Sequence, residues 1–206
     1  MFSDLSATGI VFVLLSLIIG IIVHELMHGV VAYWLGDRTA ADAGRLTLNP
    51  LASVDPVGTI LVPFIAIVYL NTLFLAAKPV PFNPDRVKWD EYGAALVGLA
   101  GPATNFVLAL LGAGLYAIAG TAMLQEFAVI FTAINIGIMV FNLIPIPPLD
   151  GSRVLYAFAP EPVRRVMEQI EAAGFIAILA IFFAAAYLFS PYISDVQQTI
   201  LQFLLI

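Results

Sequence analysis

The sequence contains no cysteine, few charged residues and no basic tract. Without thiols the chain can form neither a disulfide nor a thiolate metal site. Charged residues make up 11% of the 206 residues, and the net charge of -6 is spread over short loops, so we expect no nucleic-acid partner. None of these loops is long enough for a separate folded domain. We therefore expect one domain over residues 1–206, with a core at about 8–155 and a surface helix plus a last span at about 160–206.

Apolar residues, in contrast, dominate the chain. They make up 62% of the sequence, and the mean hydropathy is +1.02. Continuous apolar runs cover residues 8–35, 56–77, 92–119, 127–147 and 172–190. Each is near or above the roughly 18 to 20 residues that span a bilayer as a helix, and none alternates as a barrel strand does. The pattern predicts an all-α integral membrane protein, a polytopic helical bundle in the lipid bilayer.

The run over residues 56–77 can be a full span or a short re-entrant element after the first span. If it re-enters, every Lys and Arg falls on one face of the membrane, and Pro63 in its middle suits a broken segment. The bias of positive residues toward the cytoplasm favours this arrangement. These residues are Arg38, Arg45, Lys78, Arg86, Lys88, Arg153, Arg164 and Arg165.

The motif "HELMH" lies inside the first apolar run. His24 and His28 are four residues apart, so on a helix both imidazoles project from one face and can bind one metal ion, while Glu25 can reach a metal-bound water. This is the arrangement of zinc hydrolases. The alternative is a set of polar residues that only mediates helix packing. We favour the metal site, because ionisable groups within a span cost at least roughly 2.5 to 3.5 kcal/mol and are functional by default.

A catalytic zinc site usually has a third protein ligand. Asp150, in "FNLIPIPPLDGSR", follows an apolar span that Pro145, Pro147 and Pro148 break, so it can point into a protein-lined cavity. Its alternative role is that of a turn residue, since Asp-Gly is a common turn pair. If residues 56–77 re-enter, the spans that carry His24 and precede Asp150 run toward the same face, and the three ligands reach similar depth.

Asparagines on later spans are further candidate site residues. Asn105, one turn past Pro102, is expected near the depth of the metal and can bind substrate backbone or a developing oxyanion. A hydrogen bond between helices is an equally open alternative. Asn142 and Asn135 lie seven residues apart on one face of the next span. We favour Asn142 because it is nearer to Asp150.

Together, "HELMH", "AGPATN" and "NLIPIPPLDG" closely resemble the site-2 protease family of intramembrane zinc metalloproteases, in its small prokaryotic branch without a PDZ or CBS domain. The resemblance implies one Zn²⁺ per chain held by His24, His28 and Asp150, with Glu25 as general base and Asn105 and Asn142 as substrate-binding residues. Larger relatives have a β-hairpin after the metal-motif helix. The alternation in "GRLTLN", residues 44–49, fits such a strand, and a plain loop is the alternative.

The predicted function is hydrolysis of peptide bonds within or near transmembrane segments of other membrane proteins, with Glu25 taking the proton of the zinc-activated water. The predicted location is a prokaryotic plasma membrane, with the active site toward the cytoplasmic face. A divalent-metal transporter or sensor with the same ligands is the main alternative, although no repeated half is visible. A hydrolase of lipids or prenylated peptides is the second. The sequence leaves open whether the chain forms homo-oligomers.

Overall fold

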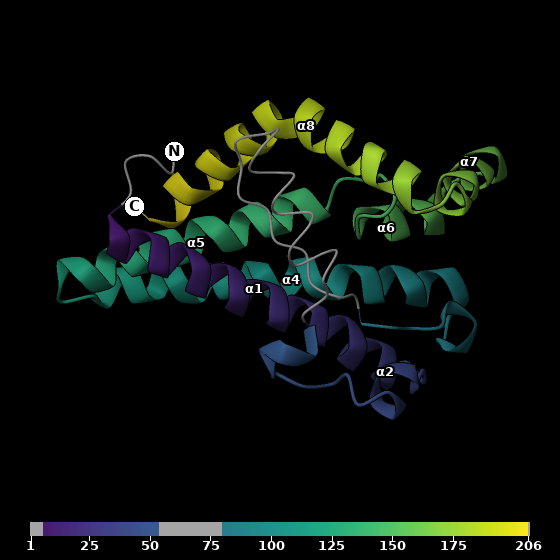
Figure 1. Cartoon of the computed structure of the whole chain (residues 1–206), viewed down its shortest axis with the longest axis horizontal. Coiled ribbons are helices and arrows are strands. Elements are labelled where there is room, and N and C mark those ends of the chain that lie inside the picture. The colour runs from purple at the N-terminus through teal and green to yellow at the C-terminus, as the bar shows by residue number, and fades with distance from the viewer. Residues whose placement is uncertain (1–5, 54–79, 206) are drawn as a thin grey trace.

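The computed structural model of the chain describes residues 6–53 and 80–205 (Figure 1). The predicted re-entrant segment at 56–77 lies outside the described residues. Within the described part, three helices are long and apolar enough to cross a membrane: α1 (Ala7–Trp34), α4 (Asp90–Ile118) and α5 (Ala122–Asn142). The prediction of an all-α integral membrane protein with a polytopic helical bundle is confirmed.

The boundaries of α5 differ from the predicted apolar run. The helix begins five residues earlier, because the Thr121 hydroxyl accepts a hydrogen bond from the Leu124 amide and caps its first turn at 3.3 Å. It ends at Asn142, ahead of the proline-rich stretch, although hydropathy continues to residue 147. Proline removes a helix donor and disfavours helical backbone at the residue before it, so the helix stops where the prolines begin.

The three long helices lie side by side, and small and polar residues are among those buried between them. Figure 1 shows that α1 and α5 run in the same direction and that α4 runs in the opposite direction, and each of the three helices contacts the other two. Ala109 of α4 and Ile136 of α5 are fully buried where these two helices meet, and the Thr132 hydroxyl donates to the Ala128 carbonyl at 2.8 Å. Small residues let membrane helices approach closely and gain van der Waals contact.

Three further helices follow the bundle: α6 (Gly151–Phe158), α7 (Glu161–Ala172) and α8 (Phe175–Leu204). The amphipathic segment that the sequence placed after Pro160 is α7, whereas α6 was not expected. Arg164 ties these helices together, since its guanidinium donates to the carbonyls of Ala157 and Ala159 and pairs with Glu91 of α4 at 3.3 Å.

The last helix is longer than the predicted span at 172–190. It continues past Pro191 to Leu204, so the apolar tail of the chain is helical. This C-terminal half packs on α5: Gln197 Nε2 donates to the Ala133 carbonyl at 2.6 Å, and Ile200, Leu201 and Leu204 contact the cluster of Ala109, Ile136 and Met139. Packing against a neighbouring helix explains why the helix persists beyond a proline.

The connection after α1 contains the short helices α2 (Thr39–Asp42) and η2 (Pro50–Ser53). Between them, residues 45–49 have no regular secondary structure, so the strand considered for residues 44–49 is not formed and the loop alternative holds. A strand needs a partner, and none pairs with this stretch in the described chain. Local bonds replace a ladder: Thr47 Oγ1 accepts from the Asn49 amide, and Asn49 Oδ1 accepts from the Leu51 amide.

The two ends of the bundle differ in composition. α2, α6 and α7 lie at one end, opposite the start of α1 and the end of α8 (Figure 1). All basic residues of the described chain belong to elements at this end: Arg38, Arg45, Arg86, Lys88, Arg153, Arg164 and Arg165. Exposed aromatic side chains accompany them, among them Trp34, Trp89, Tyr92 and Phe158. Basic residues and an aromatic belt mark a membrane–water interface, and the basic excess is typical of the cytoplasmic side.

Candidate metal centre

Two histidines of α1 and one aspartate before α6 meet inside the bundle. His24 and His28 are buried one turn apart, with their Nε2 atoms separated by 3.0 Å and their rings edge to face. Asp150 Oδ2 lies 3.1 Å from His24 Nε2 and 3.4 Å from His28 Nε2. The structure thus brings Asp150 to the two histidines, more than a hundred positions away in the sequence, as the topology argument predicts.

Asp150 occupies the N-cap position of α6, where an aspartate ordinarily accepts a bond from the first helical turn. Its side chain makes no such bond here. The backbone alone closes the turn, with the Arg153 amide donating to the Asp150 carbonyl at 3.0 Å. The carboxylate therefore faces the histidines, and the role of a simple turn residue does not account for its orientation.

The hydrogen bonds of the two rings fix which nitrogen carries the proton. His24 Nδ1 lies 2.6 Å from Asn105 Oδ1, and His28 Nδ1 lies 2.6 Å from the carbonyl oxygen of Val97. Both partners are acceptors, so each Nδ1 donates, and each neutral ring turns the lone pair of Nε2 toward Asp150. Asp150 Oδ2 is itself buried, and no residue that the structure describes donates a hydrogen bond to it. Three acceptors thus converge, an arrangement that is unfavourable without a cation among them.

A zinc ion fits this donor set. Two imidazole nitrogens and a carboxylate are ligands that zinc prefers, and they leave a fourth position open, as in catalytic sites. Ligand atoms at about 2.0 Å from a tetrahedral ion are about 3.3 Å apart. The observed separations of 3.0, 3.1 and 3.4 Å are close to that value. The three side chains therefore need to move only slightly to hold the ion.

Gly101 of α4 forms the wall of the cluster. A Cβ at this position would lie 2.5 Å from both His24 Cε1 and His28 Nε2. No side chain fits there, and the glycine lets the α4 backbone cover the imidazoles directly. The sequence suggested only that several glycines give this span a surface of small residues. The requirement for glycine at position 101 follows from the packing of α4 against the two imidazoles.

Glu25 is half-buried beside the cluster and is held by a distant part of the chain. Its Oε2 accepts a hydrogen bond from the Val80 amide at 3.0 Å. The stretch that follows Val80 is attached just past the end of α1 at two more points, because the Asn83 amide donates to Asp37 Oδ2 at 2.7 Å and the Lys88 amide donates to the Leu35 carbonyl at 2.9 Å. These bonds place the glutamate next to His24 with one carboxylate oxygen fixed.

Comparison with known proteins shows the family to which the chain belongs. Residues 117–186 match the model of peptidase family M50. "Putative zinc metalloprotease YwhC" of Bacillus subtilis is 36% identical over 203 residues, covering 93% of this chain and 90% of the relative. The chain belongs to peptidase family M50, the site-2 protease family. It is a metallopeptidase, and its cofactor is zinc.

Other relatives in the family are more distant. "Putative zinc metalloprotease Rip2" of Mycolicibacterium smegmatis is 27% identical over 197 residues, covering 88% of this chain and 71% of the relative. "Putative zinc metalloprotease MJ0611" of Methanocaldococcus jannaschii is 33% identical over 137 residues, covering 66% of this chain and 64% of the relative. No solved structure matches the chain.

Asp37, which the sequence did not single out, anchors the loop beside Glu25 of this M50 peptidase. Its side chain is fully buried, and its Oδ1 accepts from both the amide and the hydroxyl of Thr39, at 3.0 and 2.5 Å. Burial alone raises the pKa of a carboxyl, but the bonds from Thr39 and from the Asn83 amide, with Arg86 nearby, outweigh it, and the pKa of Asp37 is lowered. Asp37 is therefore charged at neutral pH.

The three asparagines of the sequence argument have different surroundings. Asn105 is fully buried, and its Nδ2 donates to the Gly20 carbonyl at 3.2 Å and to Asn135 Oδ1 at 2.9 Å. Its amide is thus engaged between helices, as in the alternative considered above. Asn142 is half-buried and donates to the Ile138 carbonyl of its own helix. Asn135, which the sequence ranked below Asn142, is the asparagine of α5 that connects to the cluster.

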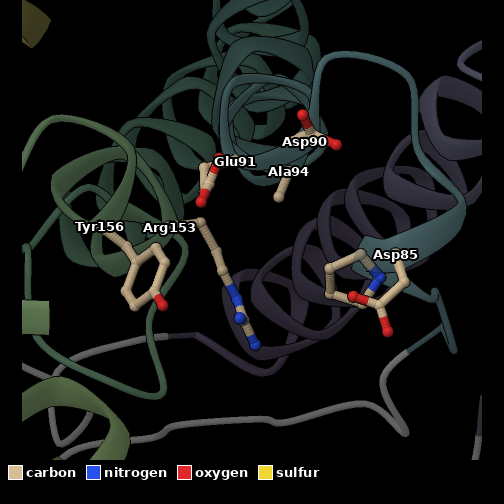
Figure 2. Close-up of a pocket in the computed structure, with 7 residues that line it drawn as sticks. Asp85, Asp90, Glu91, Ala94, Arg153 and Tyr156 are labelled. Atoms are coloured by element: carbon tan, nitrogen blue, oxygen red, sulfur yellow. The ribbon is translucent and has the colours of Figure 1, made fainter. Parts of the chain in front are cut away.

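A polar cavity of about 360 Å³ opens near the outer end of α4. Figure 2 shows the Arg153 side chain extending between Tyr156 and Asp85, with Asp90 and Glu91 on the α4 side. The Tyr156 hydroxyl donates to Glu168 at 2.6 Å, and this bond raises the tyrosine pKa. None of the three clustered acceptor residues lines the cavity, although Arg153 follows Asp150 by one helical turn.

Proposed function

We propose that this M50 peptidase is an intramembrane protease, which hydrolyses peptide bonds within or near transmembrane helices of other membrane proteins. We also propose that it works in a prokaryotic plasma membrane with its active site open to the cytoplasmic face. The observation that carries the proposal is the convergence of His24, His28 and Asp150 within an apolar helical bundle.

The depth of the cluster supports cleavage within the membrane. Exposed Trp34, at the end of α1, belongs to the aromatic belt at the basic end. His28 and His24 precede it by six and ten residues, which at 1.5 Å per helical residue is about 9 and 15 Å. Half of the hydrocarbon core of a bilayer is about 15 Å thick. The cluster thus lies within the depth of one leaflet.

The roles of the residues follow from their placement. His24, His28 and Asp150 would hold zinc. When bound, zinc would act as a Lewis acid that lowers the pKa of water and polarises a carbonyl. Glu25 is the general base. Its Oε2 is fixed by the Val80 amide, and a carboxylate held through one oxygen can present the other to an attacking water and accept its proton. Asn142, half-buried on the helix that leads to Asp150, is our candidate for binding the substrate backbone.

The substrate helix must unwind to be cleaved, because its peptide groups are covered by their own hydrogen bonds. We therefore expect purified enzyme to cleave single-span fusion proteins faster when leucines in the span are replaced by glycine, which weakens a helix by about 1 kcal/mol per residue. Equal cleavage of leucine-rich and glycine-containing spans would contradict the unwinding step.

Exchange of Glu25→Gln tests the chemistry directly. The variant keeps the size of the side chain and removes the base, so it should retain zinc and lose cleavage of these fusion proteins. Glu126→Gln, an exposed residue at the start of α5, is the matched control and should behave as wild type. Unchanged cleavage by Glu25→Gln would refute the proposal, and zinc movement across vesicles without cleavage would support a transporter instead.

Orientation is tested by cysteine accessibility, since the chain has no cysteine of its own. Single cysteines at Arg38, Arg86 and Arg165 should all react with a membrane-impermeant reagent from the cytoplasmic face. Labelling of position 38 from the opposite face to position 86 would contradict the arrangement.

A further inference from the structure

Two buried asparagines link His24 to the centre of the bundle in a continuous chain of hydrogen bonds. Asn105 of α4 accepts from His24 Nδ1, and Asn135 of α5 accepts from Asn105 Nδ2. We propose that Asn105 and Asn135 are positioning residues, which together fix the proton of His24 on Nδ1 and so raise the affinity of the site for zinc. This inference rests on His24 being a zinc ligand and not on the identity of the substrate.

The direction of every hydrogen bond in this chain is set by backbone carbonyls. Asn135 Nδ2 donates to the Phe131 carbonyl at 2.9 Å, so its Oδ1 must face Asn105. Asn105 Nδ2 donates to the Gly20 carbonyl at 3.2 Å, so its Oδ1 must face His24. Because carbonyl oxygens only accept, these contacts assign the oxygen and nitrogen of both amides.

The role of Asn135 is to prevent the amide of Asn105 from turning over. If Asn105 flipped, its oxygen would meet Asn135 Oδ1 and the Gly20 carbonyl, placing acceptors against acceptors in a fully buried site. A flipped amide would also offer a donor to His24 Nδ1 and favour the proton on Nε2, the nitrogen that must bind zinc. His28 does not depend on this chain, since its Nδ1 faces the Val97 backbone carbonyl, which cannot flip.

Close approach of the helices makes room for this chain. A Cβ on Gly20 would lie 2.9 Å from Asn135 Oδ1 and 3.5 Å from Asn105 Nδ2. The α1 backbone can thus contact the amide pair only because residue 20 has no side chain. Both asparagines are fully buried, so water does not compete for their hydrogen-bond partners in this arrangement.

Zinc affinity is the first test. Full-length protein in detergent is titrated with zinc against a chromophoric chelator, for wild type, Asn105→Leu and Asn135→Leu. We expect both variants to bind zinc about 10 to 100 times more weakly, the usual effect of losing a bond to a metal-ligating histidine. Wild-type affinity in both variants would overturn the proposal.

Thr132→Val is the matched control for that titration. Thr132 is equally buried on α5, three residues before Asn135, but its hydroxyl bonds within the described residues go to the carbonyls of Ala128 and Ala109 and not to His24 or Asn105. Its loss should lower stability without changing zinc affinity. A similar weakening of zinc binding in this control would show that the asparagine effects are general packing effects and would overturn the proposal.

The proton position is the second test, and the chain suits it because it contains only two histidines. In zinc-free protein with ¹⁵N-labelled histidine, nitrogen chemical shifts recorded over a range of pH report the tautomer of each ring in its neutral form. We expect the Nδ1–H form for both rings in wild type, and a shift of His24 alone toward the Nε2–H form in Asn105→Leu and Asn135→Leu. An unchanged His24 tautomer would overturn the proposal.

If the leucine variants do not fold, Asn135→Ala, a smaller change on the far side of the chain, is used for both measurements with the same criteria. Neither measurement requires proteolysis. Failure of the Glu25→Gln test would therefore leave these results standing, and the two proposals can fail independently.

Discussion

Replacement of Gly101 by alanine is the sharpest probe of the metal centre. The added Cβ would lie 2.5 Å from His24 Cε1 and His28 Nε2, whereas ordinary contact begins at 3.4 Å. Either α4 or the two rings must therefore retreat by about 0.9 Å, while a zinc site tolerates deviations of only about 0.2 Å in its bond lengths. Displacements of about 1 Å near reacting groups cost about 100-fold in rate. We expect Gly101→Ala to lose most of its zinc affinity and about 100-fold or more in peptidase activity.

The assay is zinc content after dialysis against a chelator, measured beside cleavage of a single-span fusion protein. Gly114→Ala is the control on the same helix, because within the described chain nothing beyond the local helix backbone lies within 4 Å of a Cβ at that position. It should keep zinc and activity, and it should gain slightly in stability because alanine favours helix. Wild-type zinc content in Gly101→Ala would refute the placement of α4 against the imidazoles.

Three further predictions concern single side chains. Asp150→Ala should lose the tightly bound zinc, as measured by metal analysis of purified protein, and full retention would remove Asp150 from the ligand set. The pKa of Asp37 is lowered from its usual 3.8. Its hydrogen bonds therefore stabilise the loop above that pH and are lost as the pH falls through the lower folded-state pKa. Limited proteolysis of the loop with an acid-active protease should accelerate as the pH falls below about 3.8 in wild type, and Asp37→Asn should lack this acid-dependent step. Arg164→Ala should lower the free energy of unfolding in detergent by about 1 to 3 kcal/mol, because it breaks bonds to two helix-end carbonyls and to Glu91. An unchanged denaturation midpoint would contradict that role.

The sequence predicted the fold class because bilayer dimensions act on local composition. Runs of about 20 apolar residues can satisfy their backbone in lipid only as helices, so α1, α4 and α5 follow from hydropathy. The sequence was less informative about where these helices begin and end, because capping residues and prolines determine the helix boundaries. Hydropathy continued past Asn142, but the proline-rich stretch ended α5 there. Hydropathy also gave no signal for the short helix α6. Arg164 contacts the end of that helix through the carbonyls of Ala157 and Ala159, and these contacts form only in the folded chain.

The spacing of "HELMH" likewise determined that His24 and His28 share one helix face, because helical periodicity requires it. The orientation of Asp150 was open, since an aspartate before glycine can form a turn, cap a helix or bind a metal. Tertiary structure decided the orientation of Asp150. It places α1 and α5 parallel, so that the segment after α5 reaches the later part of α1, where the histidines lie. The same assembly assigned Asn105 and Asn135 to His24 and gave Gly101 its place against the rings. These roles depend on distances between helices, which local sequence does not encode.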